Sequence, residues 1–212
     1  MNVIKEKSHS KLSPSAAKRW LTCPGSVALI AALPEGRRTS KFAAEGTVAH
    51  EVGELCLRNN TDPSDYKGKI FTADGFKFKV TQEMIDAVEE YVDYVREVIH
   101  DSEVQADEFV ELQVEVKSSL SFLGIPGLDG GTSDTVLICR GHEFVEIADY
   151  KHGAGVAVDV INNSQARSYG LGVMESLGIK RGDNWEIRNT IIQPRAHHKD
   201  GRIRSEIMTS DE

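Results

Sequence analysis

Apolar residues recur with a helical period in the first half of the chain. The clearest helix is predicted over residues 81–100, where one face is apolar and the opposite face is acidic. A serine followed by a proline, Ser13-Pro14, is typical of a helix start, so a short helix is expected over residues 14–22. A further helix is predicted over residues 39–58, before a loop rich in asparagine and proline.

The second half of the chain carries strand patterns instead. Alternating or β-branched segments predict strands over residues 109–116, 132–139, 144–151, 189–193 and 203–208. A helix over residues 161–177, ended by Gly178, separates the third strand from the fourth. Because a helix lies between strands, we expect an α/β fold in which a mixed sheet is covered by helices. A length of 212 residues suits one domain.

One predicted hairpin brings two aspartates and a lysine together. If residues 140–143 form a four-residue turn, the strands on either side pair so that Asp134 lies opposite Asp149. Side chains alternate along a strand, so Lys151 shares the face of Asp149 and Asp134. Opposed carboxylates repel each other unless a cation neutralises them, and their oxygens suit Mg²⁺ or Mn²⁺. From spacing alone, an incidental surface ion pair is the alternative interpretation.

Several motifs in order resemble the RecB-like branch of the PD-(D/E)XK nucleases. The matching elements are an N-terminal opening over residues 13–24, a G-x-x-x-H motif from Gly46 to His50, the D…(D/E)-x-K signature of Asp134, Asp149 and Lys151, and a Q-x-x-x-Y motif from Gln165 to Tyr169. The D-x-K element alone is weakly specific, whereas the full set in this order is fairly specific. The resemblance covers roughly residues 12–194.

This resemblance implies a fold and a domain organisation. The fold would be a restriction-endonuclease-like core, with a mixed central β-sheet flanked by helices. The chain, residues 1–212, would form a single nuclease domain. It would consist of an N-terminal helical part over residues 12–100 and a catalytic core over residues 107–208.

The resemblance also implies roles for individual residues. Asp134, Asp149 and the backbone carbonyl of Tyr150 would hold Mg²⁺ or Mn²⁺, and His50 would be a further ligand. Lys151 would position the attacking water and stabilise developing charge. Gln165 and Tyr169, four residues apart on one helix face, would hold the lysine, the water or the DNA backbone. Ordinary helix packing is the alternative interpretation for Tyr169.

The cysteines argue against other metal centres. Some relatives bind an iron–sulfur cluster through one N-terminal and three C-terminal cysteines. Cys23 matches the first position, but the C-terminal three are missing, so no iron–sulfur cluster is expected. The three cysteines are far apart in sequence, which does not fit a zinc ribbon or a disulfide framework.

Charge is unevenly distributed in this acidic chain, whose net charge is −8. Residues 1–41 hold eight basic against two acidic residues, a net charge of +6. Arg37, Arg38 and Lys41 of this segment are candidates for substrate phosphate binding, although a solvated basic face explains the charge equally well. Residues 81–115 hold twelve acidic residues against one arginine, a net charge of −11. Such an acidic face would repel a duplex lying along it.

Two other groups of residues are weaker candidates for function. Glu111 and Glu115 lie on the strand that precedes Asp134, and one of them could approach the site. His197 and His198 lie among basic residues near the C-terminus, where they would touch phosphate or form a solvated hairpin end.

The function expected from these patterns is that of a Mg²⁺- or Mn²⁺-dependent DNA exonuclease in phage-type recombination or end processing. The alternatives are a structure-specific endonuclease with the same site and a non-catalytic nucleic-acid-binding module. Expected partners are DNA ends or single strands. A recombination protein, a single-strand-binding protein and further copies of the chain itself are additional candidates. No apolar run spans a bilayer and no secretory signal opens the chain, so a cytoplasmic location without membrane contact is expected.

Overall fold

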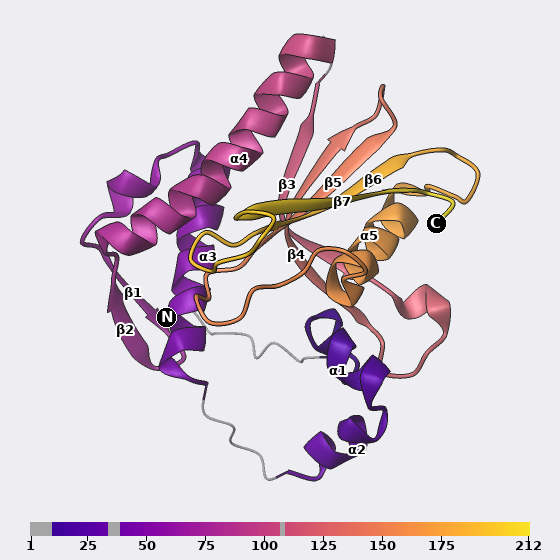
Figure 1. The fold of residues 1–212 in the computed structure, drawn as a ribbon, viewed down its shortest axis with the longest axis horizontal. Coiled ribbons are helices and arrows are strands. Elements are labelled where there is room, and N and C mark those ends of the chain that lie inside the picture. The colour runs from indigo at the N-terminus through magenta and orange to yellow at the C-terminus, as the bar shows by residue number, and fades with distance from the viewer. Residues whose placement is uncertain (1–9, 34–38, 107–108) are drawn as a thin grey trace.

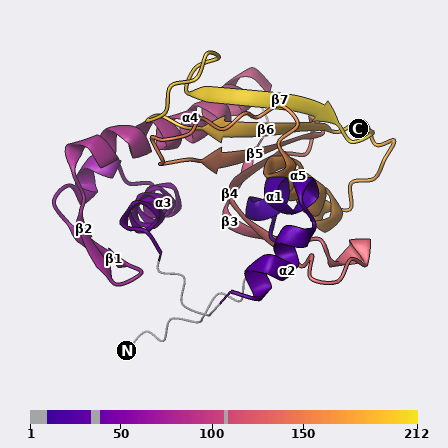
Figure 2. The ribbon, with the colours of Figure 1, turned by 60° about the horizontal axis from the view of Figure 1, so that its bottom comes forward.

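A five-stranded mixed sheet organises the protein, whose computed structural model describes residues 10–33, 39–106 and 109–212, apart from the side chains of residues 104–106 (Figure 1). The strands, in their order across the sheet, are β3 (Glu111–Ser119), β4 (Gly130–Cys139), β5 (Phe144–Tyr150), β6 (Glu186–Ile192) and β7 (Ile203–Thr209). Neighbouring strands are antiparallel except β5 and β6, which are parallel. Figure 2 shows the sheet from β3 to β7, with the short helix α1 (Ala17–Thr22) next to α5 (Ser164–Leu177).

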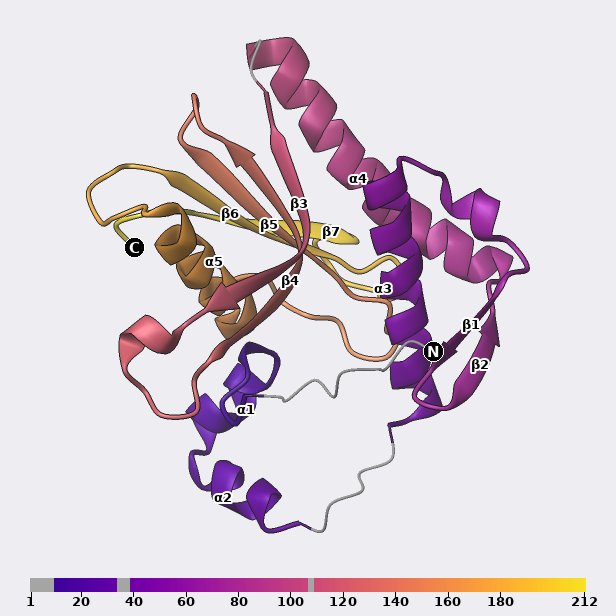
Figure 3. The same ribbon diagram turned by 180° about the vertical axis from the view of Figure 1, so that it is seen from behind.

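Helices cover both faces of this sheet, which confirms the predicted α/β architecture. Helix α5 connects the parallel strands β5 and β6 and packs on one face. Helices α3 (Lys41–Asn59) and α4 (Gln82–Ala106) pack together on the other side (Figure 3). No helix in the described residues has the length and apolar character that crossing a bilayer would require.

Alternation along the strands divides the core into two layers. On β4, Val136 faces the smaller layer under α5, and Leu137 faces the larger layer under α3 and α4. On β5, Ile147 and Ala148 divide in the same way. Both faces of each central strand are therefore buried.

The N-terminal part, expected to be helical over residues 12–100, also contains a small hairpin, so this expectation was incomplete. Strands β1 (Ile70–Ala73) and β2 (Phe76–Lys79) are joined at Asp74-Gly75, whose φ angles are 49° and 81°. Positive φ at both central residues is what a type I′ turn requires, and Asp-Gly favours it.

The short helix predicted over residues 14–22 consists of the 3₁₀ turn η1 (Pro14–Ala16) followed by α1. Three further short elements lay outside the prediction: helix α2 (Gly25–Ala31) and the 3₁₀ turns η2 (Pro63–Tyr66) and η3 (Ser121–Leu123).

Capping residues fix the two helices that matter for the site. Ser40 accepts a hydrogen bond from the backbone N–H of Ala43 at 3.1 Å, so α3 begins at Lys41. The side chain of Asn163 accepts hydrogen bonds from the backbone N–H groups of Gln165 and Ala166, so α5 begins at Ser164 and not at residue 161. Gln165 is therefore held in the first turn of α5.

Candidate active site

The predicted pairing of β4 with β5 is confirmed. The ladder joins Cys139 to Phe144 and continues up to the residues next to Asp134 and Asp149. Asp134 and Asp149 are the next two residues beyond the last ladder pair, Thr135 with Ala148, at the end of the hairpin away from the turn. Both carboxylates are largely buried: the Asp134 side chain is 15% exposed and that of Asp149 is 8% exposed.

His50 reaches Asp134 from helix α3. Its Nδ1 atom lies 3.0 Å from Oδ1 of Asp134, and Oδ2 of Asp134 accepts the backbone N–H of Tyr150 at 2.8 Å. Burial acts against ionisation of Asp134, but the charge and hydrogen bond of His50 outweigh it, so the pKa of Asp134 is lowered. Burial likewise acts to lower the pKa of His50, yet Asp134 raises it overall. The two residues thus stabilise each other as an ion pair.

Lys151 and Gln165 hold the second aspartate. The Nζ atom of Lys151 lies 2.7 Å from Oδ2 of Asp149 and donates to Oε1 of Gln165 at 3.2 Å. The amide nitrogen of Gln165 donates to Oδ1 of Asp149 at 3.3 Å and to the Tyr169 hydroxyl at 3.1 Å. Burial raises the pKa of Asp149 despite the opposing effect of Lys151. The lysine, glutamine and tyrosine singled out by the sequence motifs therefore form one connected group around this carboxylate.

Tyr150 supports the site from behind. Its ring stacks on Tyr91 at 5.0 Å and lies 5.2 Å from the His50 ring. Its hydroxyl lies 2.8 Å from Nδ1 of His152, and Arg195 lies 2.7 Å from Nε2 of the same histidine. Burial lowers the pKa of His152 to about 4. The neutral ring therefore accepts at Nε2 from Arg195, which can only donate, and donates from Nδ1 to the tyrosine.

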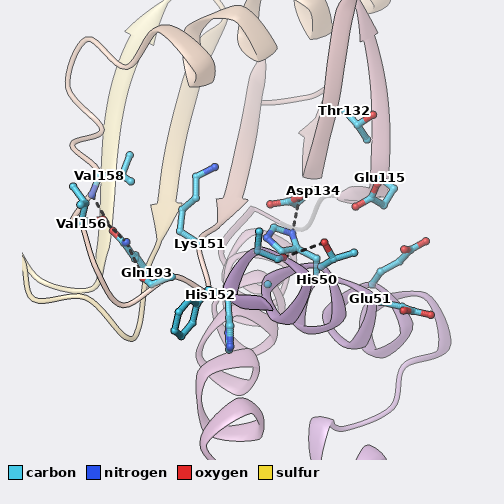
Figure 4. A pocket seen from close by; sticks show the side chains of 16 residues that line it. His50, Glu51, Glu115, Thr132, Asp134, Lys151, His152, Val156, Val158 and Gln193 are labelled. Atoms are coloured by element: carbon cyan, nitrogen blue, oxygen red, sulfur yellow. Dashed lines mark hydrogen bonds and ion pairs between the residues drawn. The ribbon is translucent and has the colours of Figure 1, made fainter. Parts of the chain in front are cut away.

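Glu115 is the acidic residue of β3 that approaches the site. It has a φ of 56°, uncommon for a residue with a side chain. The ladder between β3 and β4 pairs Val114 with Thr135 and Val116 with Ser133, and skips the intervening Glu115 and Asp134. Glu115 lines the same cavity as Asp134 (Figure 4). Glu111, the other candidate on this strand, lies 3.7 Å from Arg140 instead.

A cavity of about 850 Å³ opens over these residues. Figure 4 shows Val156, Val158 and Gln193 at one end of it, and Glu51 and Glu115 at the other, with Lys151 and Asp134 between them. Helix α3 contributes one long wall: Phe42, Ala43, Gly46, Thr47, His50, Glu51 and Glu54. Sequence reasoning missed Phe42 and Val156, because exposed apolar residues carry no motif.

Of the three basic residues that the sequence suggests for phosphate binding, the structure describes one. Arg37 and Arg38 lie outside the described residues. Lys41 is exposed at the start of α3, directly before Phe42 of the cavity wall. Near the C-terminus, Arg195 pairs with Glu83 of α4 at 2.6 Å, and Arg202 contacts Glu90 of the same helix. These two arginines therefore attach the loop between β6 and β7 to α4. The sequence pattern had instead predicted that the basic residues around His197 and His198 touch phosphate or form a solvated hairpin end.

The candidate ligands do not form a closed metal shell. No group of three or more histidine, cysteine, aspartate or glutamate side chains is arranged to hold a metal ion in the part of the chain that the structure describes. His50 and Asp134 contact each other, whereas Lys151 and Gln165 engage the carboxylate of Asp149. The charges of Lys151 and His50 supply the neutralisation that the sequence interpretation assigned to a cation.

The chemistry of the two carboxylates nevertheless suits Mg²⁺ or Mn²⁺, because Asp134 and Asp149 stand together at the end of the β4–β5 hairpin and these cations take carboxylate oxygens as ligands. The 3.0 Å between Nδ1 of His50 and Oδ1 of Asp134 is a hydrogen-bond distance, so His50 would join the ligands only after losing the proton that it shares with Asp134. A buried carboxylate with a raised pKa, such as Asp149, is also a group whose charge a cation would stabilise.

A comparison with protein families assigns the chain to one family. A family model with the description "Protein of unknown function (DUF2800)" matches residues 9–208. The match covers most of the 212 residues, so the chain belongs to this family.

Proposed function

We propose that this member of the DUF2800 family is a Mg²⁺- or Mn²⁺-dependent nuclease of the PD-(D/E)XK type that degrades DNA from an end. One observation carries the proposal. Residues from α3, β4, the end of β5 and α5 meet in two linked groups, His50 with Asp134 and Asp149 with Lys151 and Gln165. The sequence motifs single out every one of these residues. His50, Asp134 and Lys151 line one cavity, and Asp149 and Gln165 each contact Lys151.

The roles follow from the contacts. A divalent cation bound by His50, Asp134, Asp149 and the Tyr150 carbonyl would polarise a phosphate and lower the pKa of a bound water. Lys151 presents a positive charge beside Asp149, where it orients a water molecule and stabilises charge that develops on the phosphate. Gln165 fixes Lys151 through its carbonyl oxygen, and its amide nitrogen binds Asp149 and Tyr169.

The choice of DNA and of an end-dependent reaction rests on the resemblance and on charge. The chain is acidic overall, and α4 presents acidic residues, so contact with a polyanion is confined to the cavity and its surroundings. A nuclease of this kind would act in the cytosol on DNA ends or single strands, in recombination or end processing. A recombination protein or single-strand-binding protein is the partner that such an activity calls for.

The test is metal-dependent cleavage. Labelled linear DNA is incubated with the protein in Mg²⁺, in Mn²⁺ and in EDTA, and cleavage is expected with either metal and not with EDTA. Asp149→Asn should abolish cleavage, whereas Asp101→Asn, which changes an exposed aspartate on α4, should leave it intact. Absence of cleavage of both DNA and RNA by folded protein in both metals would overturn the proposal.

A further inference from the structure

Two apolar side chains at the cavity are almost fully exposed. Phe42 on α3 is 85% exposed, and Val156, in the loop between β5 and α5, is 83% exposed. Both line the cavity that holds Asp134 and Lys151. Apolar side chains of this size are usually covered, and an exposed aromatic face at a binding cavity offers a stacking platform.

Gly46 leaves open space between Phe42 and the site. A Cβ atom built at Gly46 would meet no atom of the described residues within 4 Å, although Gly46 lies inside helix α3 and lines the cavity. Glycine weakens a helix interior relative to alanine, and no described protein atom requires its small size here. The volume above Gly46 therefore belongs to the cavity, one helical turn from Phe42 and one from His50.

We propose that this end of the cavity binds an unpaired segment of one DNA strand, with a base stacked on the Phe42 ring and facing Val156, and with the backbone passing over Gly46 toward Asp134 and Lys151. The inference rests on the proposed nuclease function and specifies its substrate. An unpaired strand is the occupant because an aromatic ring can stack only on a base whose face is free.

The spacing along α3 gives the length of this segment. Phe42 and His50 are eight positions apart, which corresponds to about 12 Å along a helix. At about 3.4 Å per stacked nucleotide, this distance accommodates three to four nucleotides. The base on Phe42 is therefore about three to four positions from the phosphate at the site.

The opposite end of the cavity sets the direction of the strand. Glu51 and Glu54 line it beyond His50, together with Glu115. Phosphates are repelled from this end, so the strand enters past Phe42 and its terminus lies near the site.

The experiment measures base stacking without cleavage. A single-stranded oligonucleotide carries the fluorescent base 2-aminopurine at successive positions from one end or the other, and binding is measured in EDTA. Quenching should peak about three to four nucleotides from one end. Phe42→Ala should remove it and raise Kd about tenfold, whereas Phe42→Tyr should retain it. Phe109→Ala, at a phenylalanine that is 79% exposed but outside the cavity wall, is the matched control and should have no effect.

A second variant blocks the path instead of removing the platform. Gly46→Leu should fold with an unchanged or higher Tm, because its Cβ meets no neighbour, yet bind the oligonucleotide at least tenfold more weakly. Normal binding and quenching by Phe42→Ala or by Gly46→Leu would overturn the proposal. A preference for blunt duplex over single strand, or a change in oligomeric state with Phe42→Ala, would also overturn it.

The two proposals fail separately. Metal-dependent cleavage with unaltered binding in both variants would leave the nuclease standing and remove the strand path. Position-dependent quenching without cleavage in any metal would leave the strand path and remove the nuclease.

Discussion

The Nδ1 atom of His50 lies 3.0 Å from Oδ1 of Asp134, although 84 positions separate the two residues in the chain. Helix α3 brings the histidine over the end of the β4–β5 hairpin, and the Tyr150 ring, packed between His50 and Tyr91, supports it there. The pair is therefore positioned by the packing of the protein itself.

We expect His50→Ala to weaken Mn²⁺ binding about tenfold or more. Loss of a metal ligand lowers the affinity for the metal at least as much as loss of a residue that only orients a ligand. Titration calorimetry with Mn²⁺ measures this directly. His100→Ala, at an exposed histidine of α4, is the control and should bind the metal as the unaltered protein does. Equal affinity in both variants would remove His50 from the metal site.

Lys151→Ala should separate catalysis from binding. Single-turnover cleavage is expected to fall by about a hundredfold or more, because Lys151 is the charged donor beside Asp149. The Kd for DNA, measured by anisotropy in EDTA, should change only a few-fold, since one lysine is a small part of a multi-phosphate interface. Lys199→Ala, whose side chain is 84% exposed, should change neither quantity. Unchanged cleavage by Lys151→Ala would exclude a catalytic role.

Glu146 should make stability depend on pH. Its Oε1 accepts hydrogen bonds from Tyr94 and Thr190, while Oε2 has no hydrogen-bond partner among the described residues and lies 3.6 Å from Arg188. Burial raises the pKa of Glu146 despite these neighbours. Because the pKa of Glu146 is higher in the folded than in the unfolded protein, its contribution to stability is fully present at a pH below the ordinary pKa. This contribution is lost as the pH rises through the folded pKa.

The stability of Glu146→Gln relative to the unaltered protein should therefore increase as the pH rises above the ordinary range of a glutamate carboxyl. Denaturant unfolding at several pH values measures this difference. Glu175→Gln, at an exposed position of α5, should give a flat difference. A flat difference for Glu146→Gln as well would show that its pKa is not raised.

Gly131→Ala tests the packing behind Tyr169. An added Cβ would lie 2.9 Å from Cε1 of Tyr169 and 3.1 Å from Cγ of Pro14. The free energy of unfolding should fall by about 1–3 kcal/mol, as expected for overpacking. Cleavage should fall as well, because displacement of Tyr169 disturbs its contact with Gln165. Gly25→Ala is the control, because a Cβ there meets nothing within 4 Å in the part of the chain that the structure describes. Full stability and activity in Gly131→Ala would mean that the ring moves freely.

Local patterns predicted the hairpin half of the site. A four-residue turn and strict alternation fix which residues of β4 and β5 face each other, so the positions of Asp134, Asp149 and Lys151 follow from counting. Gln165 and Tyr169 share a helix face for the same kind of reason. His50 was reached only through a resemblance, because no local rule says how α3 crosses the sheet.

The remaining features depend on long-range contacts that no local sequence pattern reveals. Glu115 lies across from Asp134 because of the register between β3 and β4, and a ten-residue connection, residues 120–129, leaves that register open from sequence alone. The exposure of Phe42 depends on which surfaces the other helices cover. The β1–β2 hairpin is different: Asp74-Gly75 is a strong local signal, and it was overlooked.

The requirement for a DNA end is the broadest prediction. The acidic residues at the far end of the cavity, Glu51, Glu54 and Glu115, oppose passage of a continuous backbone through it, and the acidic helix α4 opposes a duplex lying along that helix. Covalently closed circular duplex should therefore survive conditions in which the same DNA, linearised, is degraded. Nicked circles provide the control, because they have interruptions but no duplex ends. Equal loss of closed and linear DNA would favour the endonuclease alternative.

Lys41 and the two arginines that precede it in the sequence should affect substrate capture more than the reaction itself. Lys41 is exposed directly before Phe42, and Arg37 and Arg38 precede it in the sequence. Charge reversal at these three positions should raise KM more than it lowers kcat, because groups that bind DNA away from the reacting bond contribute equally to ground and transition states. The salt dependence of binding should become shallower at the same time, since fewer phosphates are neutralised. A fall in kcat with unchanged KM would instead assign these residues to the reaction, and the path of the strand past Phe42 would have to run elsewhere.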